Sequence, residues 1–325
     1  MYEPRSKTIL ALTALLFVAG QLAVGLVLDR APLRVRFHEA EQALDRLRAR
    51  GDSADVAIFG SSRINALTDP AQVEARLRET LGARAPNVTS VGFNGGDLIG
   101  SEIMLELVLA DGMRPKLAVI ELTPEWIRYP VPFINGQLLR AFTWRDVGDW
   151  LPELIRGTRT TLLCARLFPV YCYRTELLIW MTGKKPPHLA APPAGEPKPR
   201  VTPPDDPRHG AQRWARRMRN YRVSPRAVGV LERIVDRCRE ARLECVFVES
   251  PVTSTHRAVL DGQVATAFTA ALDQARKERP LEFLDFHDRL PDDVFEDSTH
   301  GNAQGEALFS VIFADEVIAP RWAAR

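Results

Sequence analysis

An aspartate and a histidine near the end of the chain form its most informative motif. Asp297 precedes His300 by three residues, in a polar run that leads into the last predicted helix. On a turn of this kind the two side chains can meet at one point. The imidazole can then act as a general base, while the carboxylate fixes its tautomer and stabilises the imidazolium. The spacing therefore indicates acid–base chemistry that needs a nucleophile.

A serine far upstream supplies that nucleophile. Val56–Phe59 is continuously apolar and is predicted to be a buried strand, and Gly60-Ser61-Ser62-Arg63 follows it directly. A serine on the sharp turn after a strand is exposed at the carboxyl edge of the sheet, where open α/β sheets place their sites. We therefore expect Ser62 to meet the Asp297–His300 pair at that edge.

Other polar residues near predicted strand ends are weaker candidates. Glu249 ends the fourth predicted strand, where it either binds substrate or is a solvent-exposed carboxylate. Arg63 is expected to bind an anionic group or to pair with Asp97. His256 lies in a polar segment predicted to be an exposed loop. At the end of the fifth predicted strand lie Asp285 and His287. We expect them to contact the site residues without contacting the substrate.

The elements that must position these residues alternate regularly along the chain. Short apolar segments are predicted as strands at Val56–Phe59, Asn87–Val91, Leu117–Leu122, Leu243–Glu249 and Leu281–Asp285. Helical patterns occur at Ala71–Leu81, Gly100–Leu109, Pro225–Ala241, Val264–Lys277 and Asn302–Ile318. Apolar strands separated by helices are typical of a parallel sheet covered on both faces. We expect an α/β fold with a doubly wound, flavodoxin-like, five-stranded parallel sheet.

The alternation is interrupted by an insertion at about residues 131–221. Its first part is helical and aromatic, and the run Leu162–Trp180 contains too many charged residues for a membrane span. We favour packing of this part onto the sheet domain; the alternatives are a lid or a position at the membrane interface. The segment Gly183–His209 is rich in proline and charge and is expected to be an exposed, mobile loop. The basic run Arg213–Arg219 is expected to be a solvated helix face.

Composition excludes several classes of protein. At 325 residues and 46% apolar content, the chain can build a large packed core. A net charge of +2 is too small to indicate a nucleic-acid partner. The four cysteines match no zinc-binding spacing, and a disulfide between Cys164 and Cys172 stays open at this level.

The N-terminal region predicts a membrane anchor. Ile9–Leu28 carries no charge and, at 20 residues, is long enough to cross a bilayer as a helix. The run is long for a cleaved signal peptide, so we expect an uncleaved anchor over residues 1–30, a stalk over 31–53 and an α/β domain over 54–325. Basic residues flank the span on both sides, which leaves its orientation open.

Taken together, these motifs resemble the SGNH (GDSL-type) hydrolase superfamily, over roughly residues 54–318 without the insertion. Gly60-Ser61-Ser62 resembles the family's Gly-Asp-Ser motif, with Ser61 in place of aspartate, which gives Ser62 the role of nucleophile. The resemblance makes Gly95 an oxyanion-binding residue, since a glycine lets a backbone N–H approach a developing oxyanion. Asp297 and His300 align with the family's Asp-x-x-His pair.

One family motif is missing. Where the family has Gly-x-Asn after its third strand, this chain has Glu121-Leu122-Thr123-Pro124-Glu125. Thr123 or Glu125 can line the site, but neither supplies the amide donor, and Asn94 is a candidate replacement. Losing one oxyanion donor typically lowers turnover by roughly 10² to 10³.

The resemblance implies a serine esterase or O-acyltransferase that needs no metal or organic cofactor. Membrane-anchored members of the family suggest an extracytoplasmic site that acts on a cell-envelope glycan or its precursor. No nucleic-acid partner is expected. Two alternatives remain at this level. One is a catalytically weak scaffold that holds a membrane acyltransferase; the other is a lipid esterase facing the cytoplasm, if the flanking arginines set the topology.

Overall fold

A computed structural model describes residues 4–31, 36–49, 54–131, 136, 138–183 and 207–325. The chain forms two compact units, which we describe separately. The first contains Met1–His38 and Gly136–Pro199, and the second contains Glu39–Asn135 and Arg200–Arg325. The first unit thus groups the N-terminal helix with the first part of the insertion. The predicted domain bounds at 1–30, 31–53 and 54–325 stay a prediction.

The second unit is built on a parallel sheet of five strands in the order β2-β1-β3-β4-β5. The strands are β1 (Val56–Phe59), β2 (Val88–Ser90), β3 (Leu117–Glu121), β4 (Glu244–Glu249) and β5 (Phe283–Asp285). Each lies within its predicted segment, so the α/β class and the parallel sheet are confirmed. All residues of β1 and β3 are buried, because the sheet is covered on both faces, and all of them are apolar except Glu121 at the end of β3.

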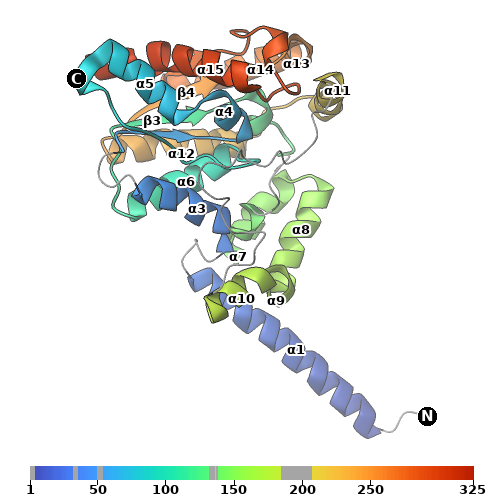
Figure 1. Cartoon of the computed structure of the whole chain (residues 1–325). Coiled ribbons are helices and arrows are strands. Elements are labelled where there is room, and N and C mark those ends of the chain that lie inside the picture. The colour runs from blue at the N-terminus through green and yellow to red at the C-terminus, as the bar shows by residue number, and fades with distance from the viewer. Residues whose placement is uncertain (1–3, 32–35, 50–53, 132–135, 137, 184–206) are drawn as a thin grey trace. The chain divides into compact units, whose positions relative to one another are not determined.

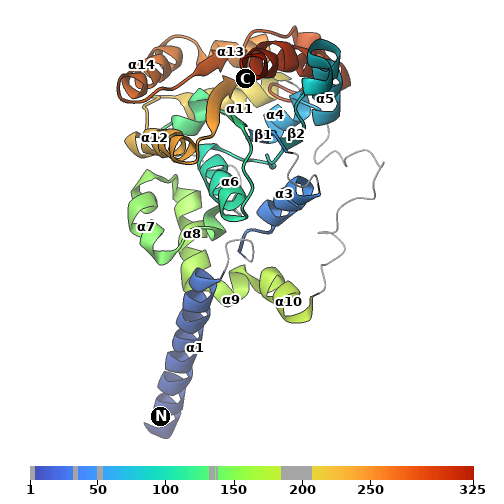
Figure 2. The ribbon, with the colours of Figure 1, turned by 90° about the vertical axis from the view of Figure 1, so that its left-hand side faces the viewer.

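Helices pack on both faces of this sheet (Figures 1 and 2). On one face lie α5 (Pro70–Leu81) and α15 (Ala303–Ile312), and on the other lie α6 (Leu98–Ala110) and α12 (Pro225–Glu240). The long C-terminal helix predicted from Asn302 continues past α15 as a π-type segment, Phe313–Ile318, and then as α16 (Ala319–Ala323). Apolar side chains of α5, α15 and this segment form one core cluster with β1 and β3.

Other helices of this unit connect to the site or flank it. They are α3 (His38–Arg48), α4 (Ser62–Leu67), α11 (Pro207–Met218), α13 (Ser254–Leu260) and α14 (Gln263–Glu278). Helix α3 is the described part of the predicted Leu33–Arg50 helix, and α11 contains most of the basic run Arg213–Arg219. The Gly183–His209 loop lies largely outside the described residues. Helix α13 was not expected, because the polar segment around His256 lacks an apolar periodicity.

The first unit begins with α1 (Pro4–Arg30). Within the described residues of this unit, one helix is long and apolar enough to cross a membrane, Ser6–Arg30. The remaining helices are α7 (Trp144–Trp150), α8 (Arg156–Leu167), α9 (Pro169–Cys172) and α10 (Arg174–Thr182). The run Leu162–Trp180 is thus broken into three helices. The first break lies before Pro169, which lacks the N–H that a continuing helix needs. All four cysteines are free thiols.

Candidate active site

The turn after β1 places Ser62 at the carboxyl edge of the sheet. Ser61 is the N-cap of α4, and its hydroxyl accepts a hydrogen bond from the N–H of Arg63 at 3.0 Å. Ser62 is therefore the first helical residue and is half-buried. The turn packs so closely on β3 that a Cβ on Gly60 would lie 2.6 Å from the Cβ of Glu121. Only glycine fits at position 60 without movement of its neighbours.

A continuous chain of hydrogen bonds joins Ser62, His300 and Asp297. The Oγ of Ser62 lies 2.8 Å from Nε2 of His300. The other ring nitrogen of His300, Nδ1, lies 2.8 Å from Oδ2 of Asp297. A carboxylate only accepts, so Nδ1 carries the proton and Nε2 is left to accept from the Ser62 hydroxyl. The His300 side chain remains 33% exposed, which leaves it accessible from solution.

The loop that carries Asp297 and His300 is held by its own backbone. An isolated antiparallel bridge joins Phe295 to Gly301, and Oδ1 of Asp297 accepts from the N–H groups of Thr299 (2.8 Å) and His300 (2.9 Å). Burial by itself raises the pKa of Asp297, but the hydrogen bond and charge of His300 and these N–H donors bring it below its ordinary value. The carboxylate is therefore ionised at neutral pH and able to orient the imidazole.

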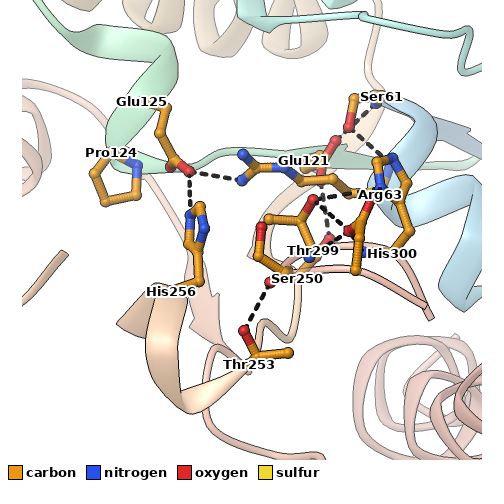
Figure 3. A network of polar contacts seen from close by, with 12 residues as sticks. Ser61, Arg63, Glu121, Pro124, Glu125, Ser250, Thr253, His256, Thr299 and His300 are labelled. Carbon is orange, nitrogen blue, oxygen red and sulfur yellow. Dashed lines mark hydrogen bonds and ion pairs between the residues drawn. The ribbon is translucent and has the colours of Figure 1, made fainter. Parts of the chain in front are cut away.

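A buried carboxylate on β3 fixes the nucleophile turn to the neighbouring strands. Glu121 is fully buried, and its Oε2 accepts from the backbone N–H of Ser61 at 2.7 Å. Its Oε1 accepts from the hydroxyl of Ser250, which follows β4, at 3.0 Å. Figure 3 shows this carboxylate between the turn after β1 and the turn after β4. Sequence reasoning missed Glu121, although a charged residue at the end of an otherwise apolar strand was a usable signal.

A second histidine–carboxylate pair lies in the interior of the same unit (Figure 3). Nε2 of His256 is 2.8 Å from Oε1 of Glu125, and Nη1 of Arg63 is also 2.8 Å from that oxygen. His256 and Glu125 are both fully buried. The indole rings of two tryptophans flank the Arg63 guanidinium, each with its centroid 5.3 Å away, Trp126 and Trp214.

The charges of this buried network favour an ionised glutamate and a neutral histidine. Burial alone raises the pKa of Glu125, but the charge of Arg63 and the hydrogen bond with His256 bring it well below its ordinary value. Burial lowers the pKa of His256, against the opposing effect of Glu125. A neutral His256 therefore donates from Nε2 to an ionised Glu125, and Arg63 balances the charge.

Two expectations from the sequence are wrong at this network. His256 is buried in α13 and not exposed in a loop, because packing against Glu125 and Trp214 encloses it. Arg63 pairs with Glu125 and not with Asp97, since its side chain is only 5% exposed and its guanidinium lies beside the Glu125 carboxylate.

Asp97 instead caps α6, because its carboxylate accepts a hydrogen bond from the N–H of Gly100 at 2.9 Å. Burial raises the pKa of Asp97 to about 7, against three backbone N–H donors.

The predicted oxyanion residues lie on a turn beside the nucleophile turn. Asn94 and Gly95 are the central residues of a turn closed by a hydrogen bond from Gly96 N to Phe93 O at 3.0 Å. Asn94 is exposed, and Gly95 has a φ of 66°, a left-handed conformation that favours glycine. Phe93 N donates to Gly60 O at 3.1 Å, which ties this turn to the residue two before Ser62.

Thr123, after β3, is buried, and its hydroxyl has no hydrogen-bond partner within the described part of the chain. Glu249 is also buried, so the prediction of a solvent-exposed carboxylate there was wrong. Burial raises the pKa of Glu249 well above its ordinary value, assisted by the nearby charges of Asp285 and Glu125. Asp285 and His287 pair with each other at 2.5 Å in an exposed position. Among the described residues, no hydrogen bond or ion pair joins the side chains of that pair to Ser62, His300 or Asp297.

A hollow of about 540 Å³ lies at the opposite edge of the sheet, at the amino ends of the strands. It is lined by Asp55, Lys116 and Trp322, among others, and contains no triad residue. In the described ranges no group of three or more histidine, cysteine, aspartate or glutamate side chains is arranged to hold a metal ion.

No protein-family model matches the chain, and no curated protein matches it. The resemblance to SGNH hydrolases therefore depends on the motifs and the geometry above.

Proposed function

We propose that this protein is a serine ester hydrolase or O-acyltransferase of the SGNH type. One observation carries the proposal, namely the unbroken hydrogen-bond chain from the Ser62 hydroxyl through His300 to Asp297. Serine hydroxyls are weak nucleophiles until an adjacent base removes their proton, and a carboxylate that orients the base completes the arrangement. The partly exposed positions of the three side chains let a substrate carbonyl approach Ser62.

The strand order supports the same proposal. An order of 2-1-3-4-5 is that of flavodoxin-like, doubly wound sheets, whose ligands bind where the strand order reverses, between β1 and β3. Ser62 follows β1, and Glu121, which holds the turn before it, ends β3. The candidate nucleophile is therefore at the switch point that this architecture favours for sites.

The mechanism follows from the tautomer. His300 Nε2 accepts the Ser62 proton as Oγ attacks an ester carbonyl, and Asp297 stabilises the imidazolium that forms. The imidazolium then protonates the leaving alcohol, and an acyl group remains on Ser62. Water or a sugar hydroxyl, deprotonated by His300, attacks this ester, the bond between the acyl carbon and Ser62 Oγ breaks, and Oγ takes its proton back from the His300 imidazolium. Attack by water gives hydrolysis, and attack by the sugar gives transfer. No step of this sequence requires a metal or an organic cofactor.

The oxyanion donors in this proposal are the backbone N–H groups of Ser62 and Gly95, with the Asn94 side chain as a third. The Ser62 N–H lies in the first turn of α4 and has no acceptor within that helix. Thr123 stands where the family places an amide donor. Turnover below that of family members with the complete set is therefore expected, by roughly 10² to 10³ for one donor.

The membrane-spanning length of α1 supports an anchored enzyme. We propose that the catalytic unit faces the extracytoplasmic side and acts on an envelope glycan or its precursor. The alternative is a catalytically weak scaffold that holds a membrane acyltransferase. The one observation that favours it is the missing amide donor after β3.

Hydrolysis of p-nitrophenyl acetate by the full-length chain in detergent tests the enzymatic proposal. Ser62→Ala should abolish turnover above the uncatalysed rate, because Ser62 carries the acyl group in the proposed mechanism. Ser254→Ala is a matched control, since Ser254 lies on α13 and bonds Asp292; it should retain full activity. If turnover is absent, or equal in wild type and Ser62→Ala, the enzymatic proposal is wrong and the scaffold alternative remains.

A further inference from the structure

The last helices of the first unit expose an unusual number of large apolar side chains. Met181 is 78% exposed, Tyr171 69% and Trp180 66%. The exposed set lies between the end of α8 and the end of α10 and comprises Leu167, Phe168, Tyr171, Leu178, Trp180 and Met181. A contiguous segment with this many exposed apolar residues marks a surface that contacts protein or membrane. We call this set the apolar edge.

Contacts with α1 fix the level of the apolar edge along the candidate membrane span. The backbone N–H of Val170, in α9, donates to the side-chain oxygen of Gln21 at 3.3 Å. Leu28 of α1 packs with Tyr173, and Val24 packs against the same cluster. Figures 1 and 2 both show α9 beside the carboxyl-terminal part of α1. These contacts give Gln21, a polar residue within an apolar run, a specific partner.

The depth of these contacts matches the boundary between acyl chains and headgroups. Ile9–Leu28 fills the span, so Gln21 lies seven residues before its end, or about 10 Å along the helix axis at 1.5 Å per residue. Amphipathic segments at a bilayer surface bury their apolar faces about 5 to 10 Å into this boundary. Helix α9 therefore meets α1 at the depth that such segments occupy.

A polar cluster begins where the apolar span ends. Asp29 accepts from Nη1 of Arg166 at 2.5 Å, and the Arg166 side chain is 1% exposed. The hydroxyl of Tyr173 bonds Arg166 and donates to Arg140 O at 2.9 Å. The guanidinium of Arg174 lies over the Tyr171 ring at 4.6 Å. Aromatic and basic residues side by side, next to a charged layer, are typical of the membrane–water interface.

From these observations we infer that the apolar edge is embedded in the lipid of the bilayer that α1 crosses, at the level of the headgroup–acyl boundary. We take lipid and not a protein partner as the occupant of this surface, because the apolar edge adjoins the exposed apolar side chains of α1 through the Val170–Gln21 contact. The inference requires α1 to span the membrane but is independent of the serine chemistry. It favours the interfacial alternative for the insertion over packing onto the sheet domain.

Quenching of tryptophan emission by brominated lipid tests the inference. Full-length protein is reconstituted in phosphatidylcholine vesicles whose acyl chains carry bromine at a shallow or a deep position. Trp180→Phe should remove most of the bromine-quenchable emission, and the loss should be larger for the shallow bromine. Trp322→Phe is the control, since Trp322 lies in α16 of the second unit and its ring contacts the ammonium of Lys116. This substitution should leave the bromine-quenchable emission unchanged.

Three results would overturn the inference. A bromine-quenchable emission that falls no more in Trp180→Phe than in Trp322→Phe excludes lipid at the apolar edge. If the Trp180 emission is quenched by aqueous acrylamide, the surface is in water. If neither quencher reaches it, the surface is covered by protein, either a second copy or a different partner. Phenylalanine keeps the position apolar, so a loss of folding is not expected and circular dichroism checks it.

Discussion

Two histidine–carboxylate pairs of equal length lie in the second unit, and they differ in nearly every other respect. His300 is 2.8 Å from Asp297, and His256 is 2.8 Å from Glu125. The first pair is about one-third exposed, and the second is fully buried. The free nitrogen of His300 faces the Ser62 hydroxyl, whereas Nδ1 of His256 is buried without a hydrogen-bond partner in the described ranges.

The comparison teaches that the third group and its exposure decide what such a pair does. A neutral hydroxyl at the sheet edge gives His300 a proton to accept and leaves room for a carbonyl. The Arg63 guanidinium instead neutralises Glu125 and fixes the pair in the interior. Consecutive residues, Ser62 and Arg63, thus connect one turn to both pairs. We therefore propose that the exposed pair takes part in chemistry and that the buried pair contributes to stability.

Replacing each histidine separates the two pairs most strongly. His300→Ala should lower kcat for p-nitrophenyl acetate by roughly 10⁴- to 10⁶-fold, because the base that activates serine is lost. His256→Ala should instead lower the stability and leave kcat within about tenfold of wild type for the folded fraction. The measurement is steady-state kinetics at a temperature where both variants are folded. Equal losses in the two variants would contradict the division of roles.

Asp297→Asn should have the next largest effect on turnover. The N–H groups of Thr299 and His300 hold the amide oxygen in the place of Oδ1, so the NH2 group faces Nδ1 of His300. The NH2 group can only donate to Nδ1, which moves the ring proton to Nε2, and kcat should fall by roughly 10³ to 10⁴. The KM should change little, because Asp297 does not contact substrate in the proposed mechanism. Kinetics of the same substrate checks this, and a change in KM alone would argue against an orienting role for Asp297.

Glu125→Gln tests the buried pair through stability. It leaves the Arg63 charge buried without a partner, which should reduce the free energy of unfolding by about 3 to 5 kcal/mol. The double variant Arg63→Met, Glu125→Gln should recover part of that loss, because no unpaired charge remains. Urea unfolding followed by circular dichroism provides the values. A loss below about 1 kcal/mol in the single variant would show that the ion pair contributes little.

Asp97→Asn should have a smaller, pH-dependent effect. The pKa of Asp97 is raised to about 7 in the folded chain, above an unfolded value of about 4. Its contribution to stability is therefore fully present below about pH 4 and is lost as pH rises towards 7. Asparagine is also a good N-cap and does not ionise. The variant should thus lack the wild-type decrease of roughly 1 to 4 kcal/mol between pH 4 and 7; parallel pH profiles would contradict the burial effect.

Much of this arrangement could be predicted because it depends on local pattern. The apolar runs of β1 and β3 are typical of doubly covered parallel strands, so their positions followed from the sequence. Parallel strands bring their carboxyl ends to one edge, and this predicts that Ser62 approaches His300. The Asx-type turn that holds Asp297 to the backbone of His300 is likewise a local feature.

The buried network could not be predicted, because its partners come from three separate segments. The burial of His256 depends on the contact of α13 with Glu125 and Trp214, and no periodicity of its own polar segment indicates that contact. Arg63 has several acidic residues as sequence-based partners, and only the folded chain selects Glu125. Glu249 is buried for the same reason, since the covering segments and not the strand end set its exposure.

Covalent labelling of the full-length protein with a fluorophosphonate, followed by peptide mass spectrometry, tests the central claim most directly. Activated serine hydroxyls form a stable phosphonyl ester, so the adduct should lie on Ser62 and on no other serine. It should disappear in His300→Ala and persist in His256→Ala. An adduct that is absent, that lies elsewhere, or that forms equally well without His300 would contradict the account.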